Sequence, residues 1–455
     1  MQQTRLQSTS YRVWAVNSCC VVWLGFQFLL IGCENTQRPA STSPAKTNRP
    51  GSVSAVGTSA GTVPADDMEA IKRLTESGFK LLKNKEGRVI GCSAAPDDES
   101  VELIRLIAGL PNLEQVTLSG PGIKDEGLEV LAELPRLKRL NLAGSVITDA
   151  TMTIVGKIVG LTVLKLQRTS VSDAGMPALA GLQQLRALDL RSTNLSNTGM
   201  VQLASLPSLE DLQIERTRVT DAGLVHLAGL PLKAINVNRL SVGDEGLKVL
   251  AQLTTLQSLQ MDSTSVTDEG MQAIAGLTRL KRLRMRETDI TGTGFQFISG
   301  MTDLQRLELR LTSIDDAGLQ IISQLPNVEY LDISECKLVS SEGIGRHLSR
   351  LIKLKYLGLW ETKLDDSGLA MLAPLTALTE LKLESTNLTN DAVPTLLGFQ
   401  QLQRLNVSGT QLDDVGIRRL ISELPGLQWI NVANTGISLD LLDELYEQDD
   451  LEFVD

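Results

Sequence analysis

The amino-acid sequence predicts a right-handed α/β solenoid, a horseshoe in which parallel strands line the concave face and helices line the convex face. Three observations predict it. An apolar pattern recurs about every 24 residues, a helix signal follows each copy, and leucine is abundant while aromatic residues make up only 3% of the chain. One strand and one helix per unit, stacked side by side, bury a continuous core that a single unit does not have.

The repeated strand pattern is L-x-x-L-x-L. About fourteen copies run from residues 113–118 to residues 427–432, and most copies are 24 residues apart. Because alternate side chains of a strand point to opposite faces, the second and third apolar residues of each copy both point into the core. The spacing falls to 23 residues between Leu209 and Leu232 and rises to 26 between Val328 and Leu354, so we expect small bends at these two places.

A polar turn and a helix are expected after each strand. In the representative segment 220–231, Asp221 is placed to cap the helix N-terminus and Pro231 ends the helix. An early helix glycine recurs and lets neighbouring helices approach closely, for example at Gly175 and Gly368. Three residues beyond the last apolar strand position there is usually a threonine, whose hydroxyl can bond the backbone at the turn: Thr169, Thr193, Thr217, Thr264, Thr288, Thr312, Thr362, Thr386, Thr410 and Thr435.

The wording T-D-A-G-L at residues 220–224 resembles the ribonuclease-inhibitor-like and F-box-associated class of leucine-rich repeats. Bacterial exported repeat proteins of the planctomycete type are also similar. The resemblance extends from about residue 100 to the end of the chain and implies a leucine-rich-repeat solenoid. It specifies the fold and says little about the function.

The N-terminus has the pattern of an export signal. Arg5 and Arg12 precede a mostly apolar stretch, residues 13–31. The stretch ends in Leu30-Ile31-Gly32-Cys33, which resembles the bacterial lipobox; this resemblance implies a lipid on Cys33 and removal of residues 1–32. An uncleaved signal anchor is the alternative, because the apolar run is about as long as a membrane-spanning helix. Either reading places the chain outside the cytoplasm, anchored to the membrane in the bacterial periplasm or on the cell surface.

The chain divides into five expected segments. They are a signal peptide with a lipobox (1–33), a disordered Ser/Thr/Pro/Gly linker (34–66), an N-terminal cap (67–110), the repeats (111–438) and a C-terminal cap (439–455). Within the caps we expect a helix over 67–83, an atypical first strand at Arg88–Ser93, a final helix at Leu439–Tyr446 and an acidic tail, Glu447–Asp455, that shields the terminal leucines.

Composition and motifs exclude several functions. A net charge of −11 argues against a nucleic-acid partner. Two histidines, five cysteines without a legible disulfide framework, and the absence of G-x-S-x-G, H-E-x-x-H and P-loop motifs argue against catalysis, a cofactor or a metal site. The acidic pairs Asp315-Asp316, Asp365-Asp366 and Asp413-Asp414 occupy helix-cap positions, so capping explains them better than calcium does.

One stretch of the concave face is the candidate binding patch. The outward strand positions bring arginines onto two neighbouring strands, with Glu308 among them, and aromatic residues onto the next two. The patch consists of Arg282, Arg284, Arg286, Arg306, Arg310, Tyr330, Tyr356 and Trp360. Arg, Tyr and Trp are the types enriched in binding hot spots, so we expect an anionic or partly aromatic partner, a protein or a glycan. The alternative is a solvated sheet surface in which arginines pair with glutamates across strands and aromatic rings shield the sheet.

Two classes of function fit these expectations. The first is a non-catalytic, protein-binding scaffold exported and anchored to the cell envelope. The second is a structural envelope component that uses lateral contacts of the solenoid. A relative of F-box substrate receptors is a weaker reading, because no segment before the repeats resembles an F-box and because export places the chain in the wrong compartment.

Overall fold

The computed structural model describes residues 64–446 and 451–454. The predicted signal peptide, Cys33 and nearly all of the predicted linker lie outside these residues. The described helices include none that is both long enough and apolar enough to cross a membrane.

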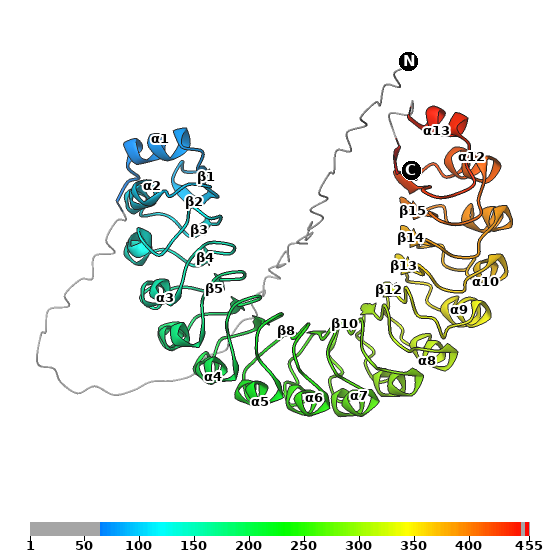
Figure 1. Ribbon diagram of the computed structural model, residues 1–455, viewed down its shortest axis with the longest axis horizontal. Helices are drawn as coiled ribbons and strands as arrows, with labels where there is room; N and C mark the ends of the chain where they lie inside the picture. Colours follow the sequence, from blue (N-terminus) through cyan, green and yellow to red (C-terminus); the bar gives the residue numbers. More distant parts are fainter. Residues whose placement is uncertain (1–63, 447–450, 455) are drawn as a thin grey trace, which may run out of the picture. The chain divides into compact units, whose positions relative to one another are not determined.

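The strands form one sheet in which successive strands pair in sequence order (Figure 1). Pairing is parallel from β2 to β17 and antiparallel only between β1 and β2. The bounds are β1 Lys80–Lys83, β2 Val89–Ala94, β3 Gln115–Leu118, β4 Arg139–Asn141, β5 Val163–Lys165, β6 Ala187–Asp189, β7 Asp211–Gln213, β8 Ala234–Asn236, β9 Ser258–Gln260, β10 Arg282–Arg284, β11 Arg306–Glu308, β12 Tyr330–Asp332, β13 Tyr356–Gly358, β14 Glu380–Lys382, β15 Arg404–Asn406, β16 Trp429–Asn431 and β17 Glu452–Val454.

Short helices, many of them 3₁₀, lie on the outer side of the described repeats, and the strands lie on the inner side (Figure 1). The bounds of the α-helices are α1 Met68–Glu76, α2 Val101–Arg105, α3 Asp149–Val155, α4 Asn197–Met200, α5 Asp221–Leu224, α6 Asp244–Leu250, α7 Asp268–Ile274, α8 Asp316–Ile322, α9 Ser341–Leu348, α10 Asp366–Met371, α11 Val393–Leu396, α12 Asp414–Glu423 and α13 Leu439–Tyr446. The 3₁₀ helices are η1 Leu106–Gly109, η2 Leu128–Glu133, η3 Asp173–Gly181, η4 Val201–Ser205, η5 Val225–Leu227, η6 Gly292–Ile298 and η7 Asn390–Ala392.

The predicted solenoid is confirmed, and each copy of the apolar pattern falls on one of the strands from β3 to β16. The middle residue of each strand aligns with the middle residue of the next, as Leu283 does with Leu307 and Leu307 with Leu331. These leucines are fully buried. The core is therefore a set of aliphatic rows that run across the strands from one repeat to the next.

The predicted role of the turn threonines is also confirmed. Thr169 Oγ1 donates to the carbonyl oxygen of Leu166 at 2.7 Å, and the other nine threonines make the same bond three residues back. The hydroxyl satisfies a buried carbonyl at the point where the strand ends. The residue just before each threonine commonly has a left-handed backbone, for example Arg168 with φ 57°.

The prediction that Asp221 caps its own helix is wrong. Thr220 is the N-cap residue, whereas Asp221 Oδ1 accepts the backbone N–H of Gly243 in the following repeat at 2.9 Å. The cause is the stacking of neighbouring repeats, which places the first helical side chain of one repeat beside the N-cap of the next. We call this recurring link the aspartate ladder.

The aspartate ladder extends through most of the described repeats. Asp244 Oδ1 and Oδ2 accept the backbone N–H and the hydroxyl of Thr267 at 2.8 and 2.7 Å. Asp149, Asp366 and Asp414 bond the serine or threonine of the next repeat in the same way. Hydrogen bonds from Ser438 hold the pKa of Asp414 below its usual value, so this carboxylate stays ionised and accepts strongly at neutral pH.

The aspartate ladder also explains an early helix glycine. A Cβ placed on Gly175 would lie 2.6 Å from Asp149 Oδ1, so only glycine leaves room for the carboxylate of the preceding repeat. In the acidic pairs, the first aspartate caps its own helix, as Asp365 does by accepting the N–H of Gly368 at 3.0 Å. The predicted capping is confirmed for this residue of each pair, and the second residue joins the ladder.

Both ends of the repeat stack differ in detail from the expected elements. The expected helix over 67–83 ends at Glu76, and Lys80–Lys83 forms β1, because Gly78 takes φ 84° and turns the chain back onto β2. The final helix has the expected bounds Leu439–Tyr446. Beyond it, residues 452–454 do more than shield leucines, because they pair with β16 as an additional strand.

Candidate functional site

The predicted patch residues come together on neighbouring strands, β10 to β13. Arg282 is in register with Arg306, Arg306 with Tyr330, and Tyr330 with Tyr356. These four side chains begin a row that continues on the same face through the first residues of the later strands, Glu380, Arg404, Trp429 and Glu452. Arg284 ends β10, and Arg286, Arg310 and Trp360 stand two residues beyond their strands.

The centre of the patch is a stack of three planar groups. The rings of Tyr330 and Tyr356 lie parallel, with centroids 3.8 Å apart and an interplanar angle of 5°. The guanidinium of Arg306 lies 3.6 Å from the centroid of the Tyr330 ring. Both tyrosines are half-buried. Burial raises the pKa of Tyr330 to about 12 and also raises the pKa of Tyr356, so both phenols remain neutral and able to donate a hydrogen bond.

A second cation–aromatic pair lies beside this stack. The guanidinium of Arg310 lies 4.6 Å from the centroid of the Trp360 ring and forms an ion pair with Glu335. Sequence reasoning missed Glu335, because it occupies the left-handed turn after β12, with φ 58°, rather than an outward strand position. The fixed spacing of the repeat was a signal that could have marked this position, because Glu335 stands two residues after Ile333, the last apolar residue of its strand pattern.

Acidic groups beneath the arginines hold them in place. Asp262 Oδ2 lies 2.5 Å from Arg284 and 2.8 Å from Arg286, and Glu308 Oε1 lies 2.6 Å from Arg306 Nε. Glu308 was expected at the concave surface, but Glu308 and Asp262 are only 6% and 4% exposed because the longer arginine side chains cover them. Burial, opposed by Arg286, raises the pKa of Asp262 to about 6.

Arg282 differs from the other arginines of the patch. It is exposed, and its side chain forms no ion pair and no hydrogen bond among the described residues. Burial of part of the side chain and the neighbouring charge of Arg306 lower its pKa from the normal arginine value. An arginine side chain is charged at neutral pH. Arg282 is therefore the cation of the patch whose charge a partner can neutralise.

A second aromatic site, not predicted from the sequence, lies further along the same row. The guanidinium of Arg404 lies 4.5 Å from the centroid of the Trp429 ring, on neighbouring strands β15 and β16. Lys382 lies between the two aromatic sites, with its ammonium 5.6 Å from the centroid of the Tyr356 ring. The row of outward first residues would have revealed Trp429 had it been followed to the last repeat.

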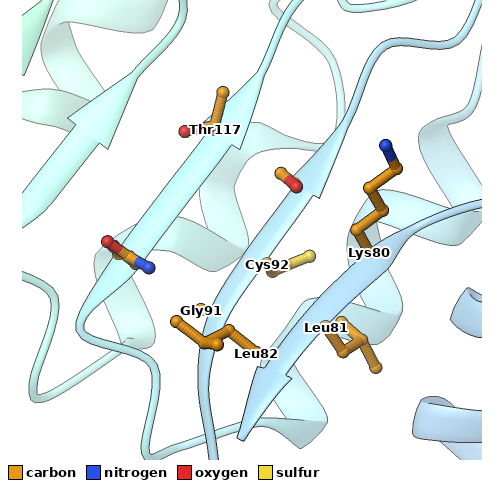
Figure 2. A pocket seen from close by; sticks show the side chains of 8 residues that line it. Lys80, Leu81, Leu82, Gly91, Cys92 and Thr117 are labelled. Atoms are coloured by element: carbon orange, nitrogen blue, oxygen red, sulfur yellow. The ribbon is translucent and has the colours of Figure 1, made fainter. Parts of the chain in front are cut away.

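No catalytic constellation accompanies the patch in the part of the chain that the structure describes. Among these residues no three His, Cys, Asp or Glu side chains converge as metal ligands. A pocket of about 380 Å³ lies near the N-terminal end, lined by residues of β1, β2 and β3 that include Cys92 (Figure 2). Burial raises the pKa of Cys92 to about 12 and that of Cys336 to about 11, so neither thiol is a nucleophile at neutral pH.

The comparison with protein families agrees with this geometry. Residues 122–345 match the model of the family described as "Leucine-rich repeat region". The chain therefore has a leucine-rich repeat solenoid fold. The matched segment begins near the end of β3 and ends within α9, so it contains β10 to β12 of the patch, and the leucine-rich repeats of β13 to β16 continue the same register.

Solved leucine-rich repeat structures are similar at low identity. An internalin of Listeria monocytogenes is 21% identical with a TM-score of 0.48, and the alignment covers 80% of this chain and 94% of the internalin. A leucine-rich repeat protein of Leptospira interrogans is 18% identical with a TM-score of 0.49, with coverage of 76% and 91%. The comparison with curated proteins found no match.

Proposed function

We propose that this leucine-rich repeat protein is a non-catalytic scaffold that binds a protein partner through β10 to β13. The observation that carries the proposal is the stack of Arg306, Tyr330 and Tyr356 on the concave face. Rings held by their neighbours lose little rotational freedom when a partner binds, and Tyr, Trp and Arg dominate the energies of protein interfaces.

The charges around the stack favour a particular kind of partner surface. Arg284, Arg286, Arg306 and Arg310 already have carboxylate partners, so a highly anionic ligand gains less from them than their number suggests. The half-buried rings and the unpaired Arg282 favour an apolar or aromatic protein surface with an acidic group at one side. The sequence predicts an anionic or partly aromatic partner. The tyrosine rings account for the aromatic part of that prediction, and Arg282 accounts for the acidic part.

A photo-crosslinking experiment tests this function. A photo-reactive phenylalanine in place of Tyr356 should form a discrete protein adduct in intact cells. The matched control carries the same group in place of Val225, which is exposed on η5 among the helices. Adding Arg306→Ala and Trp360→Ala should reduce the Tyr356 adduct by about tenfold, since removal of hot-spot residues weakens binding by at least that factor.

Two results would contradict the proposal. One is an identical set of adducts from the Tyr356 and Val225 positions. The other is an adduct whose yield does not change in the variant with Arg306→Ala and Trp360→Ala. Equal thermal unfolding midpoints of all the proteins show that the difference comes from the surface rather than from loss of folding.

We further propose that the chain is exported and anchored through a lipid on Cys33. The support is the basic start, the apolar run and the Leu30-Ile31-Gly32-Cys33 sequence, all of which lie outside the described residues. Two acyl chains give stable anchoring, whereas one gives only marginal binding. Labelled palmitate should be incorporated into the chain and lost in Cys33→Ala, while Cys20→Ala keeps the label. A wild-type chain that takes up no label would favour the uncleaved signal anchor, and label retained in Cys33→Ala would contradict lipidation at Cys33.

A further inference from the structure

The two ends of the repeat sheet are free strand edges. The pairings of the described residues join β1 only to β2, and β17 only to β16. Each edge carries an exposed aliphatic side chain, because Leu82 is 52% exposed and Val454 is 40% exposed. A free edge with unpaired backbone groups is a template for another strand.

The two edges carry opposite charges. Residues 71–88 contain six basic and two acidic side chains, and the described residues 440–446 and 451–454 contain four acidic side chains and no basic one. Lys80 and Lys83 on β1, and Glu452 on β17, form no ion pair among the described residues. Lysines on an edge strand repel a second copy of the same edge, but they attract an acidic edge.

The alternation of side chains on the two edges is also compatible with pairing. On β1, Leu81 lies in register with the buried Cys92, so it belongs to the core side of the sheet, and Lys80 and Leu82 belong to the concave side (Figure 2). On β17, Phe453 lies in register with the buried Ile430, which places Glu452 and Val454 on the concave side.

We propose that copies of this chain associate head to tail, with the β17 edge of one copy pairing with the β1 edge of the next. Because β1 runs antiparallel to the other strands, the new pair is antiparallel. In the register that keeps the core side continuous, Phe453 lies opposite Leu81 and Glu452 lies diagonal to Lys80, within reach of long side chains. The contact joins two different surfaces, so repeated use extends the stack of repeats through further copies.

Sedimentation velocity of the purified full-length chain over a concentration series tests this assembly. At about 0.05 M salt the wild-type chain should associate, and at about 0.5 M salt association should weaken, because the attraction between exposed charges is screened. Lys80→Glu and Glu452→Lys should each weaken association about fivefold, since each places like charges across the strand pair.

The decisive sample combines the two substitutions in one chain. The Lys80→Glu, Glu452→Lys double variant restores opposite charges and should associate as tightly as the wild type. Lys157→Glu, an exposed lysine that follows α3, is the matched control and should leave association unchanged.

Three outcomes overturn the proposal. The first is a chain that stays monomeric at every concentration at low salt. The second is a double variant that associates more weakly than either single variant, which shows that the two charges do not face each other. The third is association that Glu452→Lys does not weaken, which is the result expected if a β1 edge pairs with another β1 edge.

Discussion

Replacing Phe295 with alanine should lower the free energy of unfolding by about 4 kcal/mol. Phe295 lies on η6, is fully buried and is among the largest buried side chains of the described chain. Its ring reaches the next repeat, because a Cβ on Gly318 would lie 3.3 Å from Phe295 Cδ2. The cavity left by alanine would therefore open between two repeats and weaken the contact by which one repeat stabilises the next.

Phe295→Leu is the matched control for this substitution. The equivalent positions of the neighbouring repeats hold Met271 and Leu319, both fully buried, so a leucine fits this layer and should cost only about 1 kcal/mol. Urea unfolding monitored by circular dichroism gives both values. Equal losses for alanine and leucine would show that the ring does not fill the space between these repeats.

The substitution Gly368→Ala should cost about 3 kcal/mol, for the opposite reason, overpacking. Gly368 lies in α10 where it crosses α9, and an added Cβ would lie 2.6 Å from the backbone oxygen of Ser341. A backbone atom cannot rotate away as the end of a side chain can. The two helices must separate, which also strains the bonds that Ser341 makes with Asp365.

Gly276→Ala provides the comparison, because a Cβ at Gly276 meets no atom within 4 Å. This variant should keep the wild-type stability or gain a few tenths of a kcal/mol, since alanine restricts the unfolded chain more than glycine does. The same urea titration measures both glycine variants. If Gly276→Ala lost as much stability as Gly368→Ala, the cause would be general to glycine replacement and not the approach of the helices.

The sequence predicts the repeated layers of this fold well because their cause is periodic. The spacing of 24 residues places Leu283 beside Leu307, and the turn threonines bond the backbone at the turn, as the pattern predicts. The role of Asp221 could not be predicted in this way, because its partner Gly243 belongs to another repeat and the pattern within one repeat describes only local capping. β1 was missed for a similar reason, since a single hairpin at an end has no periodicity to reveal it.

The sequence predicts which residues make up the candidate site, but it does not predict which of them are buried or ion-paired. Outward strand positions correctly placed Arg306, Tyr330 and Tyr356 on adjacent strands. The burial of Asp262 beneath two arginines depends on side-chain conformations, which a strand pattern does not contain. Because these ion pairs already neutralise most of the positive charge of the arginines, the tyrosine stack is a better candidate than the arginines for the main contact with a partner.

The aspartate ladder has a consequence for how such a chain changes its length. Where the ladder is regular, a 24-residue unit supplies one carboxylate to the unit after it and one hydroxyl to the unit before it, as the unit containing Thr267 and Asp268 does with Asp244 and Thr291. A tandem duplication or deletion of a whole unit among such regular units therefore leaves no donor or acceptor without its counterpart. The hydrogen bonds that fasten neighbouring units thus allow recombination to add or remove whole units, and with them strands of the concave surface, without interrupting the connection.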